Sequence, residues 1–286
     1  MRFRAKQLDI GCITRFSKVV ATLTKSVKVC VLRLTPDKLY FVVVERGTVG
    51  GINVWCELSQ ENFFDDYKIE GKDENNEIYL EVALDQLSRT LKTAHNAQVV
   101  KIKLVKKQGA FLMVEVIQPS LVGAQRTVVH DIPVMVVPQR LWADYQEPAM
   151  PDIDVSIYLP PLRLLKSVVD RMKNLSCYLM FSANMNGELT LKVETDTVSV
   201  ATYFKELENH QFGNDDGIAS SSSSTAIRSR EQFSQVTVDI KRFGHLMQGQ
   251  FAPMKAICNV VNGRALQVFL LHEDVSLQYF IPAMMK

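Results

Sequence analysis

The spacing of apolar residues predicts a series of short strands interrupted by two helices in the first half of the chain. Alternation with a period of two predicts a strand, whereas apolar residues three and four positions apart predict a helix. The predicted strands lie at 3–7, 27–34, 38–44, 51–58, 67–70 with 77–82, 99–105, 111–117 and 127–137. The predicted helices cover 10–26 and 84–97.

The second half of the chain repeats this order of elements. Its predicted strands lie at 155–159, 178–183, 189–194, 198–204, 236–240, 256–261, 266–271 and 275–281, and its predicted helices cover 161–175 and 241–250. A repeated order of elements is the sign of a repeat architecture. We therefore expect an α+β protein of two tandem domains, each with antiparallel sheets and two helices.

Two segments break the repeat. Residues 137–154 contain three prolines, which disfavour a regular element, so we expect a connector between domains 1–136 and 155–286. Residues 206–231 contain five consecutive serines at 220–224. Such a polar segment buries too little apolar surface to offset its ordering entropy, so we expect a disordered loop inside the second domain.

The helices carry most of the positive charge. The four predicted helices contain eleven Lys and Arg residues and two acidic residues, whereas the net charge of the chain is only +2. On each helix the cations lie away from the apolar face, at Arg15, Lys18, Lys25, Arg89, Lys92, His95, Arg163, Lys166, Lys173, Lys241 and Arg242. A solvated face would explain any one helix. Four such helices together favour contacts with the phosphates of duplex DNA, without reading of the sequence.

Composition and motifs narrow the class of protein. The chain has 286 residues, 47% of them hydrophobic, and no run of 18 apolar residues, so we expect no transmembrane helix and no membrane partner. The start lacks an apolar h-region, so we expect no signal peptide. The five cysteines are widely spaced, which predicts reduced thiols in the cytosol or nucleus rather than disulfides or a zinc site.

A catalytic site is not expected, nor is a cofactor. The clusters that suggest chemistry are His130-Asp131 and His272-Glu273-Asp274, but neither has metal-ligand spacing. There is no Gly-x-Ser-x-Gly elbow and no phosphate-binding Gly-x-x-x-x-Gly-Lys loop. A hydrolase using the segment 272–274 stays as the enzymatic alternative.

Several motifs resemble one family closely. They are MRFRAK at 1–6, WCELSQENFF at 55–64, NNEIYLE at 75–81, LSRTLKTAHNA at 87–97, HDIPV at 130–134, RLW with QEP between 140 and 148, and HEDVSLQYFIPA at 272–283. Together they resemble the Hus-one subunit of the heterotrimeric nine-one-one checkpoint clamp, from residue 1 to residue 283. Residues 46–51 and the serine loop depart from the pattern.

The resemblance implies a sliding-clamp fold, with sheets on the outside of a ring and helices lining its hole. It implies a subunit without catalysis that encircles double-stranded DNA, with the helix cations facing the duplex. It implies Rad-nine and Rad-one type clamp subunits as partners, an ATP-driven checkpoint clamp loader, DNA repair enzymes as clients, and a nuclear and partly cytoplasmic location. A homotrimeric replicative clamp is the alternative within the same fold.

The resemblance also implies two kinds of partner site. The connector resembles the clamp segment beside a partner-peptide groove, with Leu141, Trp142 and Tyr145 as its apolar residues; the alternative is that these three pin the connector to the sheets. The expected subunit edges are the strands 111–117 and 198–204, through Phe111, Leu112, Met113, Val114, Val116, Val198, Val200, Tyr203 and Phe204. The alternative for these strands is an interior position in the sheet.

Overall fold

The computed structural model describes residues 1–45, 51–71, 73–119, 125–149, 151–210 and 229–284. The elements of the first half are β1 (Arg2–Gln7), α1 (Ile10–Ser26), β2 (Val29–Leu34), β3 (Lys38–Val43), β4 (Asn53–Ser59), α2 (Gln60–Phe63), β5 (Asp66–Glu70), β6 (Ile78–Ala83), α3 (Leu84–Thr93), β7 (Val99–Lys106), β8 (Ala110–Gln118) and β9 (Arg126–Val136). A 3₁₀ helix, η1 (Gln139–Tyr145), follows.

The second half repeats the order without the counterparts of α2 and β5. Its elements are β10 (Val155–Tyr158), α4 (Leu162–Met172), β11 (Tyr178–Ala183), β12 (Leu189–Glu194), β13 (Ser199–Phe204), β14 (Ser234–Asp239), α5 (Ile240–His245), β15 (Lys255–Val261), β16 (Ala265–His272) and β17 (Val275–Pro282). The expected α+β class with mostly antiparallel sheet and few helices is thus confirmed.

The strand order shows the internal repeat directly. One sheet of thirteen strands has the order β10-β15-β16-β17-β4-β3-β2-β6-β9-β8-β7-β1-β5, and a second sheet has the order β13-β12-β11-β14. The run β10-β15-β16-β17 corresponds to β1-β7-β8-β9, and β13-β12-β11-β14 corresponds to β4-β3-β2-β6. Among the described strands, one of the two possible junctions is made inside the chain, where β17 of the second half pairs antiparallel with β4 of the first.

The helices cover one side of the sheets and bury their apolar faces there. The side chain of Asp9 begins α1 by accepting a 2.7 Å hydrogen bond from the backbone N–H of Cys12, which satisfies a donor left free in the first turn. Phe16, Val20 and Leu23 of α1 are then fully buried against the sheet. The same spacing buries Leu87 and Leu91 of α3. Amphipathic spacing therefore decides which side of each helix stays exposed.

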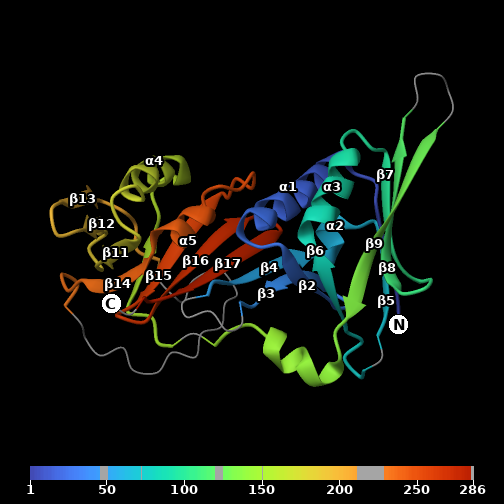
Figure 1. Ribbon diagram of the computed structural model, residues 1–286, viewed down its shortest axis with the longest axis horizontal. Coiled ribbons are helices and arrows are strands. Elements are labelled where there is room, and N and C mark those ends of the chain that lie inside the picture. Colours follow the sequence, from blue (N-terminus) through green and yellow to red (C-terminus); the bar gives the residue numbers. More distant parts are fainter. Residues whose placement is uncertain (46–50, 72, 120–124, 150, 211–228, 285–286) are drawn as a thin grey trace.

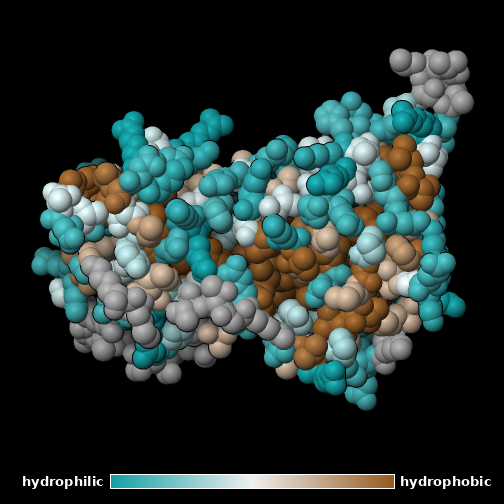
Figure 2. All heavy atoms as spheres, viewed as in Figure 1, coloured by the Kyte–Doolittle hydropathy of each residue, from teal (hydrophilic) through white to brown (hydrophobic). Residues whose placement is uncertain are grey.

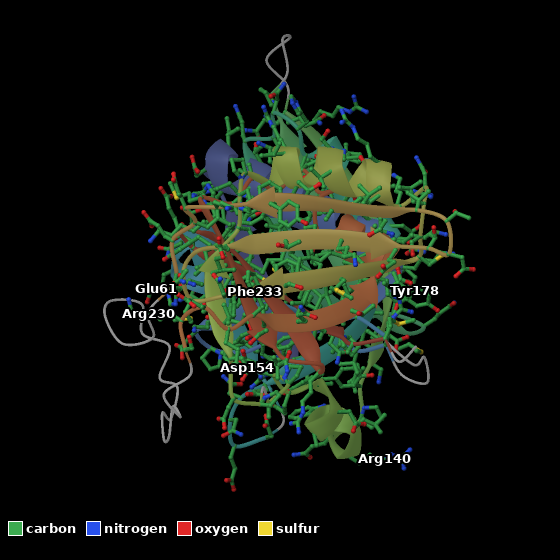
Figure 3. All side chains as sticks on the ribbon, turned by 90° about the vertical axis from the view of Figure 1, so that its left-hand side faces the viewer. Glu61, Arg140, Asp154, Tyr178, Arg230 and Phe233 are labelled. Atoms are coloured by element: carbon green, nitrogen blue, oxygen red, sulfur yellow. The ribbon has the colours of Figure 1, made fainter. Side chains whose placement is uncertain are left out.

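The connector and the helices lie on opposite sides of the molecule. In Figure 1, α1, α3, α4 and α5 lie above the sheets and η1 lies below them. Figure 3, turned by 90° about the vertical axis, again places Arg140 of η1 at the bottom, below the sheets. A surface formed by the helices is therefore separate from one formed by the connector.

The structure differs from the predicted elements in three places. A single helical turn, α2, follows Ser59 and was not expected. The connector was expected to lack regular structure, but η1 forms between Pro138 and Gln146. Residues 206–210, expected in the disordered loop, are ordered because the backbone N–H of Leu207 donates to the carbonyl of Gly187 at 2.9 Å. The serine run lies outside the described residues.

Candidate nucleic-acid interface and partner edges

The four helices that carry the predicted cations form a single row. α3 packs against α1, α1 contacts α5, and α5 packs against α4. Figure 2 shows hydrophilic residues along this side of the molecule, which is hollowed between its two ends. The predicted cations of all four helices therefore belong to one surface, which we call the helix surface.

Six of the predicted cations are exposed and form no ion pair with a described residue. They come from all four helices and are Lys18, Lys25, Lys92, Arg163, Lys166 and Lys241. His95 is exposed as well. Since a cation without a carboxylate partner keeps its full attraction for an external anion, these six are the charges that the helix surface offers to phosphates.

Three other predicted cations are on the helix surface but have acidic neighbours. Arg89 lies 3.6 Å from Asp85 on the same helix, and Lys173 lies 2.6 Å from Asp170. Exposed pairs of this kind are weak, so both cations stay available to a stronger anion. Arg242 is half-buried and lies 3.6 Å from Glu45. Both features reduce its attraction for phosphates.

Arg15 has two acidic neighbours in the second half of the chain. Its Nη1 atom lies 3.4 Å from both Glu273 and Asp274 in the turn between β16 and β17, and its guanidinium stacks over the ring of Phe63. A hydrogen bond to the Cys12 sulfur and the two carboxylates raise the pKa of Arg15. Arg15 thus ties the first helix to the second half of the chain, and its contact with DNA stays a prediction.

The contacts around Arg15 also involve residues 272–274, the segment that suggested a hydrolase. The carboxylate of Asp274 also accepts a 2.6 Å hydrogen bond from the side chain of Asn62, and the ring of His272 packs against Phe251. Its acidic residues are therefore engaged in the junction between the two halves. Among the described residues no group of three or more His, Cys, Asp or Glu side chains is placed to hold a metal ion.

The three apolar residues of the connector pack on the outer face of the central sheet. Trp142 stacks on Tyr79 of β6, with ring centroids 4.4 Å apart and planes 22° from parallel, and its Nε1 donates to the carbonyl of Val137 at 3.0 Å. Leu141 packs on the same small cluster, and Tyr145 reaches from it to the neighbouring cluster of Val42, Trp55 and Phe280. These residues therefore hold the connector on the sheet, and a partner-peptide groove beside them stays a prediction.

A mostly buried ion pair lies under the connector and was not found from the sequence. Arg33 donates from Nη2 to Glu77 at 2.7 Å and from Nε at 3.2 Å, and its guanidinium lies over the rings of Tyr40, Trp55 and Tyr79. Burial is the largest single effect on the pKa of Arg33 and lowers it, but the Glu77 hydrogen bond and the charges of the neighbouring acidic groups together raise that pKa above its ordinary value. This pair fixes the aromatic platform on which Trp142 rests.

Of the two strands expected at free edges, one is at an edge. β13 is the last strand of its sheet and, of the strands that the structure describes, pairs with β12 alone; Tyr203 on it is 69% exposed. β8, which contains Phe111–Ile117, pairs with β7 on one side and β9 on the other. The prediction for 111–117 is therefore wrong, and Leu112, Val114 and Val116 are core residues.

The edge of the first half lies instead on β9. Its last residues, Val134–Val136, pair with β6, but no described strand pairs with the side of 126–133 that faces away from β8. Pro133 was the overlooked signal, because proline in a strand is confined to edges and strand ends. Figure 1 shows β13 and β9 towards opposite ends of the long axis of the molecule.

Comparisons with known proteins agree with this geometry. Two solved clamps align over nearly their whole length: PCNA from Thermococcus kodakaraensis, with a TM-score of 0.69 at 16% identity over 98% of this chain and 99% of that one, and proliferating cellular nuclear antigen from Entamoeba histolytica, with a TM-score of 0.72 at 14% identity over 99% of both. The fold is therefore that of tandem sliding-clamp domains.

Curated relatives specify the family. Human checkpoint protein HUS1 is 48% identical over 286 residues, covering 99% of this chain and 100% of the human protein. Checkpoint protein hus1 of Schizosaccharomyces pombe is 31% identical over 275 residues, covering 96% of this chain and 94% of that protein. The family model described as "Hus1-like protein" matches residues 1–285. The chain therefore belongs to the Hus1-like protein family.

Proposed function

We propose that this chain is a non-catalytic subunit of a heterotrimeric ring that encircles double-stranded DNA and signals DNA damage to the checkpoint. The observation that carries the proposal is the helix surface, with its six unpaired cations, lying between two free strand edges towards opposite ends of the molecule. The checkpoint names of the relatives in man and fission yeast support the checkpoint role.

The helix surface suits enclosure of DNA rather than tight or sequence-specific binding. Five of its six exposed cations are lysines, whose ammonium groups act as point charges towards phosphates. Such contacts position a duplex without reading its bases. A ring that relies on enclosure for retention needs only this weak, salt-sensitive attraction, and it can then slide.

Ring closure follows from the internal repeat. Inside the chain, β17 of the second half pairs with β4 of the first over Phe280↔Asn53 to Val275↔Leu58. β9 and β13 are the corresponding strands that lack this partner. A neighbour that supplies a β13-type edge to β9, or a β9-type edge to β13, would repeat the internal junction between subunits. Two unlike edges at the two ends give head-to-tail contacts, which form a ring when the rotation between neighbours closes.

The proposed partners are a Rad-nine type and a Rad-one type clamp subunit at these edges. An ATP-driven clamp loader would open and place the ring, and DNA repair enzymes would bind its outer side. A nuclear location, with some of the protein in the cytoplasm, goes with this role. A homotrimeric replicative clamp would use the same edges with identical neighbours, so the composition of the ring separates the two functions.

The test is the mass of the assembled particle. The chain is purified alone and together with one Rad-nine type and one Rad-one type subunit from the same organism, and each sample is measured by native mass spectrometry. We expect a monomer alone and a particle with one copy of each chain in the mixture. A self-trimer of this chain, or a mixture in which it stays alone, would contradict the proposal.

A further inference from the structure

A second basic surface lies on the side of the sheet that faces away from the helices. It is formed at the β5-β1-β7 end of the large sheet, where alternate residues point away from the buried Phe3, Ala5 and Ile102. Its cations are Arg2, Arg4 and Lys6 of β1, Lys68 of β5, and Lys101 and Lys103 of β7. We call this set the outer basic face; the charge pattern of the helices gave no indication of it.

The register of the strands places like charges directly opposite one another. Arg4 is the pairing partner of Lys68 on one side and of Lys103 on the other. Lys6 is the partner of Lys101. Directly opposed like charges on one face of a sheet are destabilising. Lysine on the edge strand β5 can be explained as protection against edge pairing, but Arg4, Lys101 and Lys103 lie on interior strands, where no such protection is needed.

The acidic residues of this face neutralise only part of the charge. Glu115 is shared by Lys101 and Lys103, at 3.5 Å from each. Arg4 lies 3.6 Å from Asp66, and the more exposed Arg2 lies 3.7 Å from Glu70. Lys6 and Lys68 form no ion pair with a described residue. Six cations against three carboxylates leave an excess of positive charge that the fold itself does not use.

The internal repeat provides a control for this observation. β10, β15 and β16 correspond to β1, β7 and β8, and the central row on the same side of these strands is Ser156, Asn259 and Gln267. These three are buried and form a ladder of hydrogen bonds, from the Ser156 hydroxyl to Asn259 at 2.7 Å and from the Asn259 amide to Gln267 at 3.1 Å. Lys255 of β15 is the one lysine or arginine on this side of β10, β15 and β16, so the cluster of six cations is specific to the first half.

We propose that the outer basic face binds an extended acidic peptide segment of a partner protein. On β1 the cations recur at every second residue, which is about 7 Å along a strand. Alternate side chains of an extended peptide have the same spacing, so acidic residues at every second position can meet Arg2, Arg4 and Lys6 in turn. Half-buried Met113 and Phe111 continue the face on β8, beside Lys103, and offer contacts for apolar residues of the same peptide.

Duplex DNA fits this face less well than a peptide does. The phosphates of a duplex form a continuous line of charge, and such a line would meet the carboxylates of Asp66, Glu70 and Glu115 that lie among the cations. A peptide can place neutral or apolar residues opposite them. The face also lies on the opposite side of the sheet from the helix surface, so an acidic segment could bind while the helix surface holds DNA.

The test compares two variants of equal charge. The row variant Arg4→Gln/Lys68→Gln/Lys103→Gln removes one row of the outer basic face, and the control Lys18→Gln/Lys92→Gln/Lys166→Gln removes three cations of the helix surface. The probe is a fluorescein-labelled peptide in which glutamate alternates with leucine and threonine, and its binding to the full chain is followed by fluorescence anisotropy. We expect the row variant to bind about tenfold more weakly and the control to bind as the unchanged chain does.

Two further measurements complete the test. Because the row variant removes opposed like charges, its thermal unfolding midpoint should equal or exceed that of the unchanged chain, so that lost binding is not lost folding. A duplex oligonucleotide should fail to displace the peptide from the control variant. The proposal is overturned if the unchanged chain does not bind the peptide, if both variants weaken binding equally, or if the oligonucleotide displaces the peptide. If the row variant does not fold, Lys68→Gln alone is used.

Discussion

The guanidinium of Arg15 and the carboxylate of Asp274 lie 3.4 Å apart, one in the first helix and the other in the turn before the last strand. The pair crosses the junction where β17 joins β4, and Glu273 and Asn62 strengthen it from either side. Arg15, which the charge pattern assigned to DNA, is therefore part of the contact that holds the two halves of the chain together.

Arg15→Gln should cost a little stability and leave DNA association nearly unchanged. The pair is partly exposed, so solvent screening limits its worth to about 0.5–1 kcal/mol, a drop of roughly 1–3 °C in the unfolding midpoint. Differential scanning calorimetry measures the midpoint, and a double-mutant cycle with Asp274→Asn isolates the pair. The matched control is Lys18→Gln, which should weaken DNA association and leave the unfolding midpoint nearly unchanged. A larger loss of DNA association for Arg15→Gln than for Lys18→Gln would restore Arg15 to the DNA contact.

Trp142→Ala should lower the pKa of Tyr79. Burial raises that pKa, and so does the 2.8 Å hydrogen bond that the Tyr79 hydroxyl donates to Glu77. Because the phenol holds its proton more tightly in the folded chain, its contribution to stability is complete below the ordinary pKa of about 10 and is lost as pH rises through the folded value. Removing Trp142 lets water reach Tyr79, which lowers its pKa in the folded chain. The pH range over which Tyr79 contributes to stability therefore becomes narrower.

Absorbance at 295 nm against pH measures this change. In Trp142→Ala one more tyrosine should ionise near the ordinary value, whereas Trp142→Phe keeps a stacked ring and should titrate as the unchanged chain does. If Trp142→Ala leaves the titration curve unaltered, the connector does not shield Tyr79 in solution.

Arg33→Met should be among the most destabilising single changes under the connector. It leaves the Glu77 carboxylate, with a side chain only 12% exposed, without its cation, and breaking a mostly buried pair costs about 3 kcal/mol. Adding Glu77→Gln removes the unpaired charge and should recover part of the loss. Urea unfolding of the single and double variants gives both values. Equal stability of the two variants would mean that the carboxylate finds another partner or water.

Tyr203→Ser should weaken subunit assembly without weakening the fold. Tyr203 is 69% exposed on the edge strand β13, so its loss should change the free energy of unfolding by less than about 0.5 kcal/mol. Tyr178→Ser is the control, because Tyr178 is also exposed but lies on the interior strand β11. Analytical ultracentrifugation with the two clamp partners should show dissociation at higher concentration for Tyr203→Ser alone. Equal effects would remove β13 from the proposed interface.

The sequence predicted the fold more completely than the surfaces. The spacing of apolar residues and the position of the charges predicted α1 at its observed bounds. Ile13, Phe16 and Val20 lie on one side of the helix, and no other side is apolar enough to be buried. Local spacing does not determine which strands pair. β8 and β9 both contain many residues typical of strands, and Pro133 is the signal that β9 is the edge. Likewise, the partners of Arg15 and Arg33 lie 258 and 44 residues away, so no local pattern could reveal that those cations are already paired.

The resemblance to a known family supplied what spacing could not, but it did not indicate every surface feature. It led to the expectation of a partner-peptide groove at Leu141, Trp142 and Tyr145, where the structure has these side chains packed on Tyr79 and the adjoining aromatic cluster. It gave no indication of the outer basic face. Such features depend on which side chains meet across strands, which is a property of register.

The most direct test of the account is the salt dependence of duplex association by the assembled ring. Each cation that contacts a phosphate should contribute about 1 to the slope of log K against log salt concentration. The variant Lys18→Gln/Lys25→Gln/Lys166→Gln/Lys241→Gln, one or two changes on each of three helices, should therefore flatten the slope by roughly three to four. The control Arg4→Gln/Lys6→Gln/Lys68→Gln/Lys103→Gln should leave it unchanged. An unaltered slope in the helix variant would show that the duplex does not pass along the helix surface.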